Sequence, residues 1–153
     1  MKIINLTGNA EYAACCAQWI YDEFIKGIKT SRTYEDVLEA YRISFETELP
    51  VRLAAVYGGK CIWTVSLVHN DLRCRDYTPW LASLYVDKEH RGNKTGERLV
   101  LEIMNKAKDL GYKELYLRTE HASGYYKRLG WTFVERCEDD HGLVPDVFKH
   151  ALV

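Results

Sequence analysis

The chain has 153 residues, of which 47% are hydrophobic and 28% are charged, and its formal net charge is −1. This length and composition are typical of one globular domain with a sizeable core, so we expect residues 1–153 to form a single domain and exclude a disordered or fibrous protein. A net charge this close to zero gives no overall attraction to nucleic acid or to an anionic membrane.

The cysteines and the N-terminal segment indicate a reducing compartment. The five cysteines form no C-x-x-C pair and no Cys/His cluster with zinc-ligand spacing, so we expect free thiols and no metal site. Residues 1–12 lack the long apolar run of a signal peptide, and no apolar segment approaches the length of a membrane span. We therefore expect a cytoplasmic protein without a membrane partner.

The N-terminal third predicts one strand and two helices. Residues 3–6 form a short apolar run, and Asn9 is placed to cap a helix whose apolar stripe reaches Phe24 and which Gly27 ends. The sequence T-Y-E-D at 33–36 predicts a capping box for a second helix. We expect the inner stripe of that helix to extend to Phe45 and Pro50 to stop it.

The rest of the chain predicts a hairpin and then alternating strands and helices. Residues 51–57 and 60–68 are strand-like runs joined by Gly58-Gly59, a strong hairpin signal. Further expected elements are a strand over 80–86, a helix over 95–110, a strand over 114–118, a short helix over 122–130, and strands over 131–136 and 144–152. The order β-α-α-β-β-β-α-β-α-β-β predicts an α/β (α+β) fold with a mixed, mostly antiparallel central sheet and helices on both faces.

The segment "VDKEHRGNKTGERLV", residues 86–100, leads from a predicted strand into a predicted helix. The first N–H groups of a helix have no internal partner and lie at the positive end of its dipole, so a loop of small residues before them favours an anion. Neither a Walker A motif nor a G-x-G-x-x-G fingerprint fits this loop.

Two landmarks around this loop resemble one family. The loop carries Arg91 and Gly96 in the pattern [R/Q]-x-x-G-x-[G/A], and "YYKRLGW" follows, with Tyr126 in its aromatic-tyrosine pair. Over residues 81–136 the chain resembles the GNAT superfamily of acyl-CoA N-acyltransferases, in the small bacterial acetyltransferase type. The resemblance implies an N-acetyltransferase that passes an acetyl group from acetyl-CoA to a primary amine of a small molecule or peptide, by direct transfer in a ternary complex.

The resemblance also implies roles for individual residues. Tyr126 would protonate the leaving thiolate as general acid, a role worth ~10²–10⁴-fold in rate. Ser123 lies in a segment, with Thr119 and His121, where relatives place an asparagine that contacts coenzyme A. The backbone of the central strand would bind the pantetheine arm and the loop would bind the pyrophosphate, which gives as cofactor-binding residues Leu84, Tyr85, Val86, Arg91, Gly92, Asn93, Lys94, Thr95, Gly96 and Glu97.

Lys94 departs from the family pattern, which has a glycine there. At a position of positive φ a side chain costs about 1–2 kcal/mol, whereas an ammonium beside a pyrophosphate adds a contact worth about 1.5–3 kcal/mol. The alternative is that Lys94 extends into solvent from an ordinary helical turn. We favour a functional loop with altered contacts.

The acceptor side is less defined by the sequence. Candidate general bases, each of which could also be a solvated surface charge, are Glu46, Glu48, Asp71, Asp76 and His141. A water chain could serve in their place. Candidate walls of the acceptor pocket, which could equally be core aromatics, are Trp19, Tyr21, Trp63, Tyr77 and Trp80. Arg73 and Arg75 could meet an acidic group of the acceptor or be solvated.

Two other functions compete with the enzyme. A non-catalytic acyl-CoA-binding module of the same fold would explain Lys94 and the missing asparagine. Nucleic-acid binding would use the basic residues between 88 and 98, but Glu89 and Glu97 interrupt them, so we expect no nucleic-acid partner. A monomer and a homodimer are both compatible with the sequence.

Overall fold

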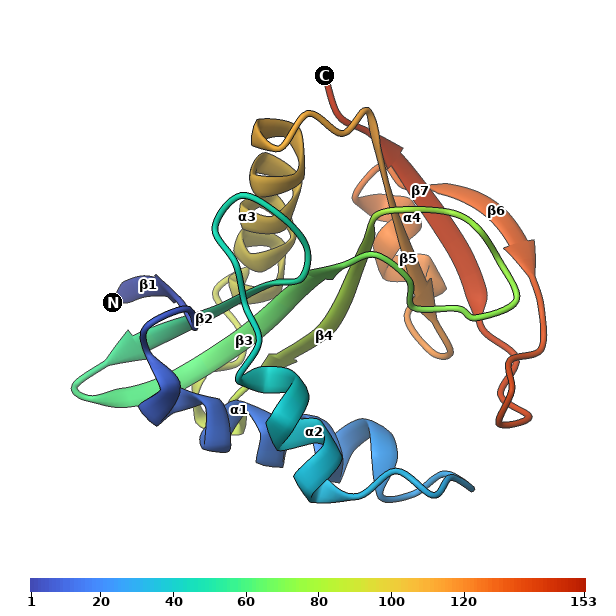
Figure 1. Cartoon of the computed structure of the whole chain (residues 1–153). Coiled ribbons are helices and arrows are strands. Elements are labelled where there is room, and N and C mark those ends of the chain that lie inside the picture. Colours follow the sequence, from blue (N-terminus) through green and yellow to red (C-terminus); the bar gives the residue numbers. More distant parts are fainter.

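The computed structural model describes all residues, 1–153, and confirms the predicted order of elements (Figure 1). The strands are β1 (Lys2–Asn5), β2 (Val51–Tyr57), β3 (Lys60–Val68), β4 (Trp80–Val86), β5 (Glu114–Thr119), β6 (Thr132–Arg136) and β7 (Asp146–Ala151). The helices are α1 (Ala13–Ile20), α2 (Tyr34–Tyr41), α3 (Thr95–Asp109) and α4 (Ser123–Arg128). None of the helices has the length and apolarity that crossing a membrane requires.

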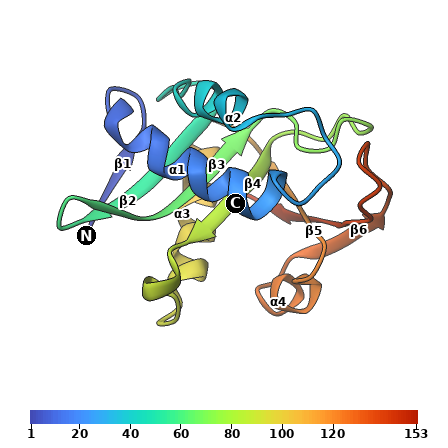
Figure 2. The same cartoon turned by 90° about the horizontal axis from the view of Figure 1, so that it is seen from below.

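The strands form one seven-stranded sheet in the order β1-β2-β3-β4-β5-β7-β6. All neighbours are antiparallel except β4 and β5, which the crossover helix α3 connects in parallel. Helices α1 and α2 cover one face of the sheet and α3 lies on the other (Figures 1 and 2). The mixed, mostly antiparallel sheet with helices on both faces is therefore confirmed.

The first helical segment differs from its prediction at both ends. Asn9 does not cap it, because its side-chain amide donates to the carbonyl oxygen of Asn5 at 2.7 Å instead. A 3₁₀ turn (Ala10–Tyr12) precedes α1, and a π-helical turn (Tyr21–Ile25) follows it. The wider π turn leaves Phe24 exposed rather than in the core.

The second helix begins as predicted and ends early. Thr33 and Asp36 form the capping box, with the Asp36 carboxylate accepting from the backbone N–H of Thr33 at 2.9 Å. The helix stops at Tyr41, so the expectation that its stripe reaches Phe45 was wrong: Phe45 lies in a loop and is exposed. The chain leaves the helix there because the backbone N–H of Phe45 binds the carbonyl of Pro50, which brings the loop back to β2.

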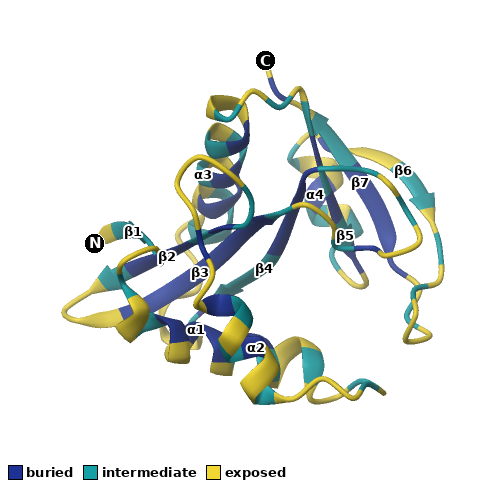
Figure 3. Ribbon diagram, viewed as in Figure 1, coloured by how far each residue is buried: buried dark blue, intermediate teal, exposed yellow.

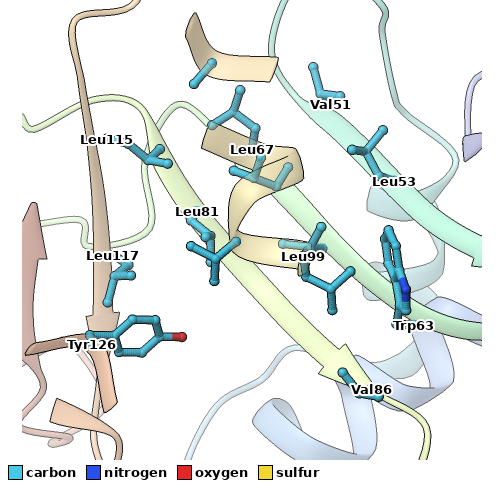
Figure 4. Packing of buried hydrophobic residues seen from close by; sticks show 14 of the residues in the cluster. Val51, Leu53, Trp63, Leu67, Leu81, Val86, Leu99, Leu115, Leu117 and Tyr126 are labelled. Carbon is cyan, nitrogen blue, oxygen red and sulfur yellow. The ribbon is translucent and has the colours of Figure 1, made fainter. Parts of the chain in front are cut away.

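Buried residues form a core on each face of the sheet. Figure 3 shows which parts of the chain are buried, and Figure 4 shows side chains of the larger cluster. On the α3 face, Leu99 and Ile103 pack against Leu67, Leu81 and other strand residues. A second cluster joins α1 and α2 to the opposite face of β2 and β3. The sheet is thus fixed from both sides over β2 to β4, and its two halves meet at β4 and β5.

Candidate functional site

Strands β4 and β5 share only one residue pair, Trp80 with Tyr116. Beyond it the strands separate, so residues 82–86 of β4 and 118–119 of β5 do not pair with each other (Figure 1). We call the space between these two segments the unpaired region. At the start of this region Ser83 has φ of 55°, and the pairing of β4 with β3 is irregular there. A left-handed residue re-aims the strand locally, and beyond it Tyr85 and Val86 pair with β3 on one side and with no strand on the other.

A cavity of about 400 Å³ lies along the unpaired part of β4. It is lined by Glu23, Phe24, Leu84, Tyr85, Val86, Arg91, Gly92, Thr95 and Gly96. Seven of these nine are residues predicted to bind the cofactor, so the structure brings β4 and the loop before α3 together. The sequence missed Glu23 and Phe24, because only the π turn turns them toward this cavity and a regular helix pattern gives no sign of it.

The loop before α3 presents unpaired N–H groups. Gly92, Asn93 and Lys94 have consecutive positive φ values of 98°, 52° and 60°. The change of hand from Lys94 to the first residue of α3 turns successive N–H groups to one side, where they form an anion-binding nest. The N–H groups of Asn93, Lys94, Gly96 and Glu97 donate to no acceptor in the protein. They lie at the N-terminus of a 15-residue helix, where the helix dipole adds to the attraction for an anion.

Lys94 occupies the left-handed position itself. Its φ of 60° and ψ of 28° place it just before the first residue of α3, and its side chain is exposed. The interpretation as an ordinary helical turn is therefore wrong. The backbone here is one that a glycine would adopt without strain, whereas Lys94 adopts it at a cost of about 1–2 kcal/mol.

Arg91 folds back over the central strand. Its Nε donates to the carbonyl oxygen of Val86 at 3.0 Å, and its guanidinium lies 5.3 Å from the centre of the Tyr85 ring. Trp19 of α1 packs on Tyr85 as well, with the ring centres 5.3 Å apart. Tyr85 is thus held between α1 and the loop, which fixes the end of β4 that lines the cavity.

Gly96, in the first turn of α3, is a position where a neighbouring side chain limits size. A Cβ at this residue would lie 3.2 Å from the hydroxyl oxygen of Tyr125 in α4. The absence of a side chain lets α4 approach the first turn of α3. The two landmark motifs of the sequence therefore meet in space at this contact.

Tyr126 lies on the α3 face of the sheet, packed among Trp131 and Phe148, with 9% of its surface exposed. Its hydroxyl points from the β5 side toward β4 (Figure 4) and has no hydrogen-bond partner in the protein. Burial raises the pKa of Tyr126 to about 12. The phenol therefore stays protonated at neutral pH and can donate a proton.

Ser123 is engaged elsewhere. Its hydroxyl donates to the carboxylate of Asp146 at 2.5 Å, and Arg136 holds the same carboxylate at 2.7 Å. Ser123 does not line the cavity. The hydrogen bond thus directs the side chain toward β7 and away from the loop before α3.

A group of charged residues lies on the face of the sheet opposite to α3 and Tyr126. We call it the polar cluster, and its members are Arg32, Arg52, Asp71, Arg118, Glu120 and Asp139. Arg118 of β5 is its centre, because its guanidinium donates to Asp139 at 2.7 Å, to Glu120 at 2.9 Å and to the backbone carbonyl of Asp71 at 3.4 Å. Burial raises the pKa of the Asp71 carboxyl to about 7, against the attraction of Arg118.

The other acceptor-side candidates lie apart from this cluster. Glu46 lines a different cavity of about 430 Å³ between β1 and α3, and Glu48 and Asp76 are exposed. Trp63 and Trp80 are core residues. Arg75 binds Glu135 and Arg73 lies 3.5 Å from Asp140, so neither arginine faces the cavity. No three His, Cys, Asp or Glu side chains are grouped closely enough to hold a metal ion.

Comparison with known proteins agrees with this geometry. An aminoglycoside 6'-N-acetyltransferase complexed with coenzyme A has a TM-score of 0.76 and 15% identity, covering 100% of this chain and 98% of that one. The aminoglycoside 6'-N-acetyltransferase from Enterococcus faecium has a TM-score of 0.71, 16% identity and coverage of 100% and 98%. An N-acetyltransferase from Staphylococcus aureus Mu50 has a TM-score of 0.69, 14% identity and coverage of 99% and 97%. These identities show the fold alone.

The sequence comparison goes further than the fold. A search among curated proteins found no match. The sequence pattern of the Acetyltransferase (GNAT) family, however, matches residues 15–131, a stretch that includes most of α1, strand β4, the loop before α3 and both tyrosines of α4. This match spans well over half of the chain. The chain belongs to the Acetyltransferase (GNAT) family.

Proposed function

We propose that the protein transfers the acetyl group of acetyl-CoA directly to a primary amine of a small molecule or peptide, in a ternary complex. The observation that carries this proposal is the continuity between the cavity along β4 and the unpaired N–H groups before α3. Such an arrangement suits a ligand with a pyrophosphate at one end and an extended, amide-containing arm at the other.

The cavity residues fit the parts of acetyl-CoA in turn. The free N–H groups of Asn93, Lys94, Gly96 and Glu97 bind the pyrophosphate, and the Lys94 ammonium adds a charge. The backbone of Leu84 to Val86, unpaired on its β5 side, binds the pantetheine amides as a neighbouring strand would. Arg91 leaves the Val86 carbonyl when the arm binds there, because both use the same oxygen.

The acetyl end then lies where β4 and β5 begin to separate. A backbone N–H after the left-handed Ser83 stabilises the oxyanion as the amine attacks the carbonyl carbon. Tyr126 donates its proton to the thiolate of coenzyme A as the C–S bond breaks. Several solved relatives are named for aminoglycoside N-acetylation, so a 6'-amino aminoglycoside is the first acceptor to test, followed by polyamines, amino acids and peptides.

The experiment has two parts. Thermal denaturation with and without acetyl-CoA tests the donor site, and we expect a concentration-dependent rise in Tm. Release of free thiol with the acceptor panel tests transfer, with Tyr126→Phe compared to Tyr125→Phe. We expect Tyr126→Phe to lower kcat by roughly 10²-fold or more and Tyr125→Phe to leave kcat within a few-fold of wild type.

Two results would contradict the proposal. If acetyl-CoA does not raise the Tm, the assignment of this cavity as the acetyl-CoA site is wrong. Tight binding of acetyl-CoA without turnover of any amine in the panel would favour a non-catalytic acyl-CoA-binding module.

A further inference from the structure

Direct transfer to an amine requires a base as well as an acid. An alkylamine has a pKa near 10, as lysine does, and therefore arrives as an ammonium ion at neutral pH. An ammonium nitrogen has no lone pair, so it must lose a proton before it can attack a thioester. The proposed function assigns the acid, Tyr126, and leaves the base open.

The register of the sheet shows where such a base must lie. Two residues beyond the pair of Trp80 and Tyr116, Ala82 and Arg118 stand at the same level on the diverging strands. Because Leu115 and Leu117 face α3, Arg118 points to the opposite face. The Tyr126 hydroxyl approaches the unpaired region from the α3 face, so an acceptor on the Arg118 face meets the acetyl group from the other side.

Asp71 lies on this second face, beside Arg118. The Arg118 guanidinium donates to the backbone carbonyl of Asp71, which holds the connection between β3 and β4 against β5. The next residue, Leu72, is buried with Trp80 in a small core cluster. Asp71 is therefore positioned by a buried neighbour and by a backbone hydrogen bond, while its carboxylate is left free.

The three carboxylates of the polar cluster differ in their hydrogen bonding. Glu120 and Asp139 both accept from Arg118, and Asp139 also accepts from the backbone N–H groups of His141 and Leu143. The half-buried carboxylate of Asp71 accepts no hydrogen bond from the protein. It is thus the member of the cluster whose lone pairs are available to an incoming proton.

The charges that face Asp71 come from three other parts of the chain. Arg118 and Glu120 belong to the end of β5, Arg52 to β2, and Arg32 to the connection between the first two helices. The three guanidinium groups favour the charged carboxylate of Asp71, whereas burial and the negative charge of Glu120 oppose it.

We propose that Asp71 is the general base that takes the proton of the acceptor ammonium. The assignment rests on the proposed acetyl transfer.

The ammonium N–H bond breaks and its proton passes to a carboxylate oxygen of Asp71, leaving a neutral amine. The amine nitrogen then forms the bond to the acetyl carbon, the C–S bond breaks, and the thiolate takes the Tyr126 proton. The second nitrogen proton restores the Tyr126 phenol through water, and Asp71 releases its proton to solvent. The pKa of about 7 for the Asp71 carboxyl suits this role.

The test measures kcat/KM against pH for wild type, Asp71→Asn and Asp71→Glu, with acetyl-CoA and a series of primary amines. Ethylamine, glycinamide and trifluoroethylamine keep the acceptor small while the pKa of the amine falls. We expect Asp71→Asn to lower kcat/KM for ethylamine by roughly 10²-fold or more and to abolish the acidic limb of the profile. The loss should shrink for trifluoroethylamine, which is already neutral at pH 7, and Asp71→Glu should restore part of the activity.

A matched control and a binding measurement separate the possible failures. Asp76→Asn alters an exposed carboxylate of the same connection and should leave the profile unchanged. Calorimetry with acetyl-CoA should give the wild-type affinity for Asp71→Asn, which shows that the variant is folded. An active wild type whose profile is unaffected by Asp71→Asn would overturn the assignment of the base alone. A wild type that binds acetyl-CoA but acetylates no amine, neither in this series nor in the acceptor panel, would overturn the proposed function and the base with it.

Discussion

Trp80 and Tyr116 form the one residue pair that joins β4 to β5, and their rings pack with centres 5.8 Å apart. Tyr77 stacks on Tyr116 at 4.9 Å, so three aromatic rings lie where the two halves of the sheet meet. This aromatic group holds the two strands together at one end only. The cavity along β4, the left-handed Ser83 and the polar cluster all lie at or beyond the point where the two strands separate.

Gly96→Ala tests the contact between the two sequence motifs. Alanine favours a helix over glycine by about 0.5–1 kcal/mol, but its Cβ would lie 3.2 Å from the Tyr125 hydroxyl oxygen. We expect Gly96→Ala alone to give no gain in the free energy of unfolding, and Gly96→Ala to stabilise a Tyr125→Phe background by roughly 0.5–1 kcal/mol. Urea denaturation of the four proteins measures this cycle. Additive effects would show that the hydroxyl does not limit residue 96.

Two variants of Lys94 distinguish the effect of its left-handed backbone from the effect of its charge. Lys94→Gly removes the left-handed strain, and we expect the free energy of unfolding to rise by up to about 1 kcal/mol. Both Lys94→Gly and Lys94→Asn remove the ammonium, and we expect each to weaken acetyl-CoA binding about tenfold and to reduce its dependence on salt. Calorimetry at two salt concentrations checks both. Unchanged affinity would mean that the ammonium stays in solvent when the donor is bound.

Glu135→Gln tests a hydrogen-bonded group that ties the β3–β4 connection to β6. Arg75 and Tyr77 hydrogen-bond the Glu135 carboxylate and lower its pKa to about 2. Because an unfolded glutamate has a pKa near 4.3, this stabilisation is complete above that pH and is lost as the pH falls to about 2. We expect Glu135→Gln to lower the free energy of unfolding by roughly 1 kcal/mol at pH 7, and the difference to vanish near pH 2.

Denaturation curves at pH 7, 4 and 2 check the Glu135 prediction. Glu138→Gln, at an exposed position three residues on, is the control and should change little at any pH. A difference between Glu135→Gln and wild type that persists at pH 2 would indicate a packing defect rather than a lost charge interaction.

Glu120→Gln should shift the acidic limb of the kcat/KM profile along the pH axis without abolishing it. The negative charge of Glu120 raises the pKa of Asp71, so its removal lowers that pKa. If Asp71 is the base, its carboxylate then persists to lower pH, and the acidic limb of kcat/KM moves to lower pH. The pH profile with ethylamine as acceptor measures this, and a limb that moves upward or stays in place argues against Asp71.

The sequence predicted the elements and brought together most residues of the cavity along β4, because both depend on local patterns. The hairpin at Gly58-Gly59, the capping box at Thr33 and the loop before α3 each follow from residues that are adjacent in the chain. Seven of the cavity residues lie in the two segments that the resemblance marked.

The remaining features depend on contacts between distant segments. The π turn that exposes Phe24 is not visible in apolar spacing, because the same spacing fits a regular helix. The hydrogen bond of Ser123 to Asp146, a residue of the last strand, has no counterpart in the local pattern around residue 123. Asp71 could not be distinguished from Glu46 or Asp76 until the fold placed Arg118 beside it.

The single shared pair between β4 and β5 has a consequence for stiffness. In a continuous sheet each strand shields the amides of the next, and the ladder keeps the two at a fixed spacing. Here the backbone of Leu84 to Val86 lacks a neighbouring strand on its β5 side. The rigidity of this segment therefore depends on what occupies that side. A pantetheine arm bound there supplies the missing hydrogen bonds, so acetyl-CoA takes the place of a neighbouring strand while it is bound. Hydrogen exchange at these residues should therefore slow when acetyl-CoA binds, while the amides paired between β2 and β3 remain as they were.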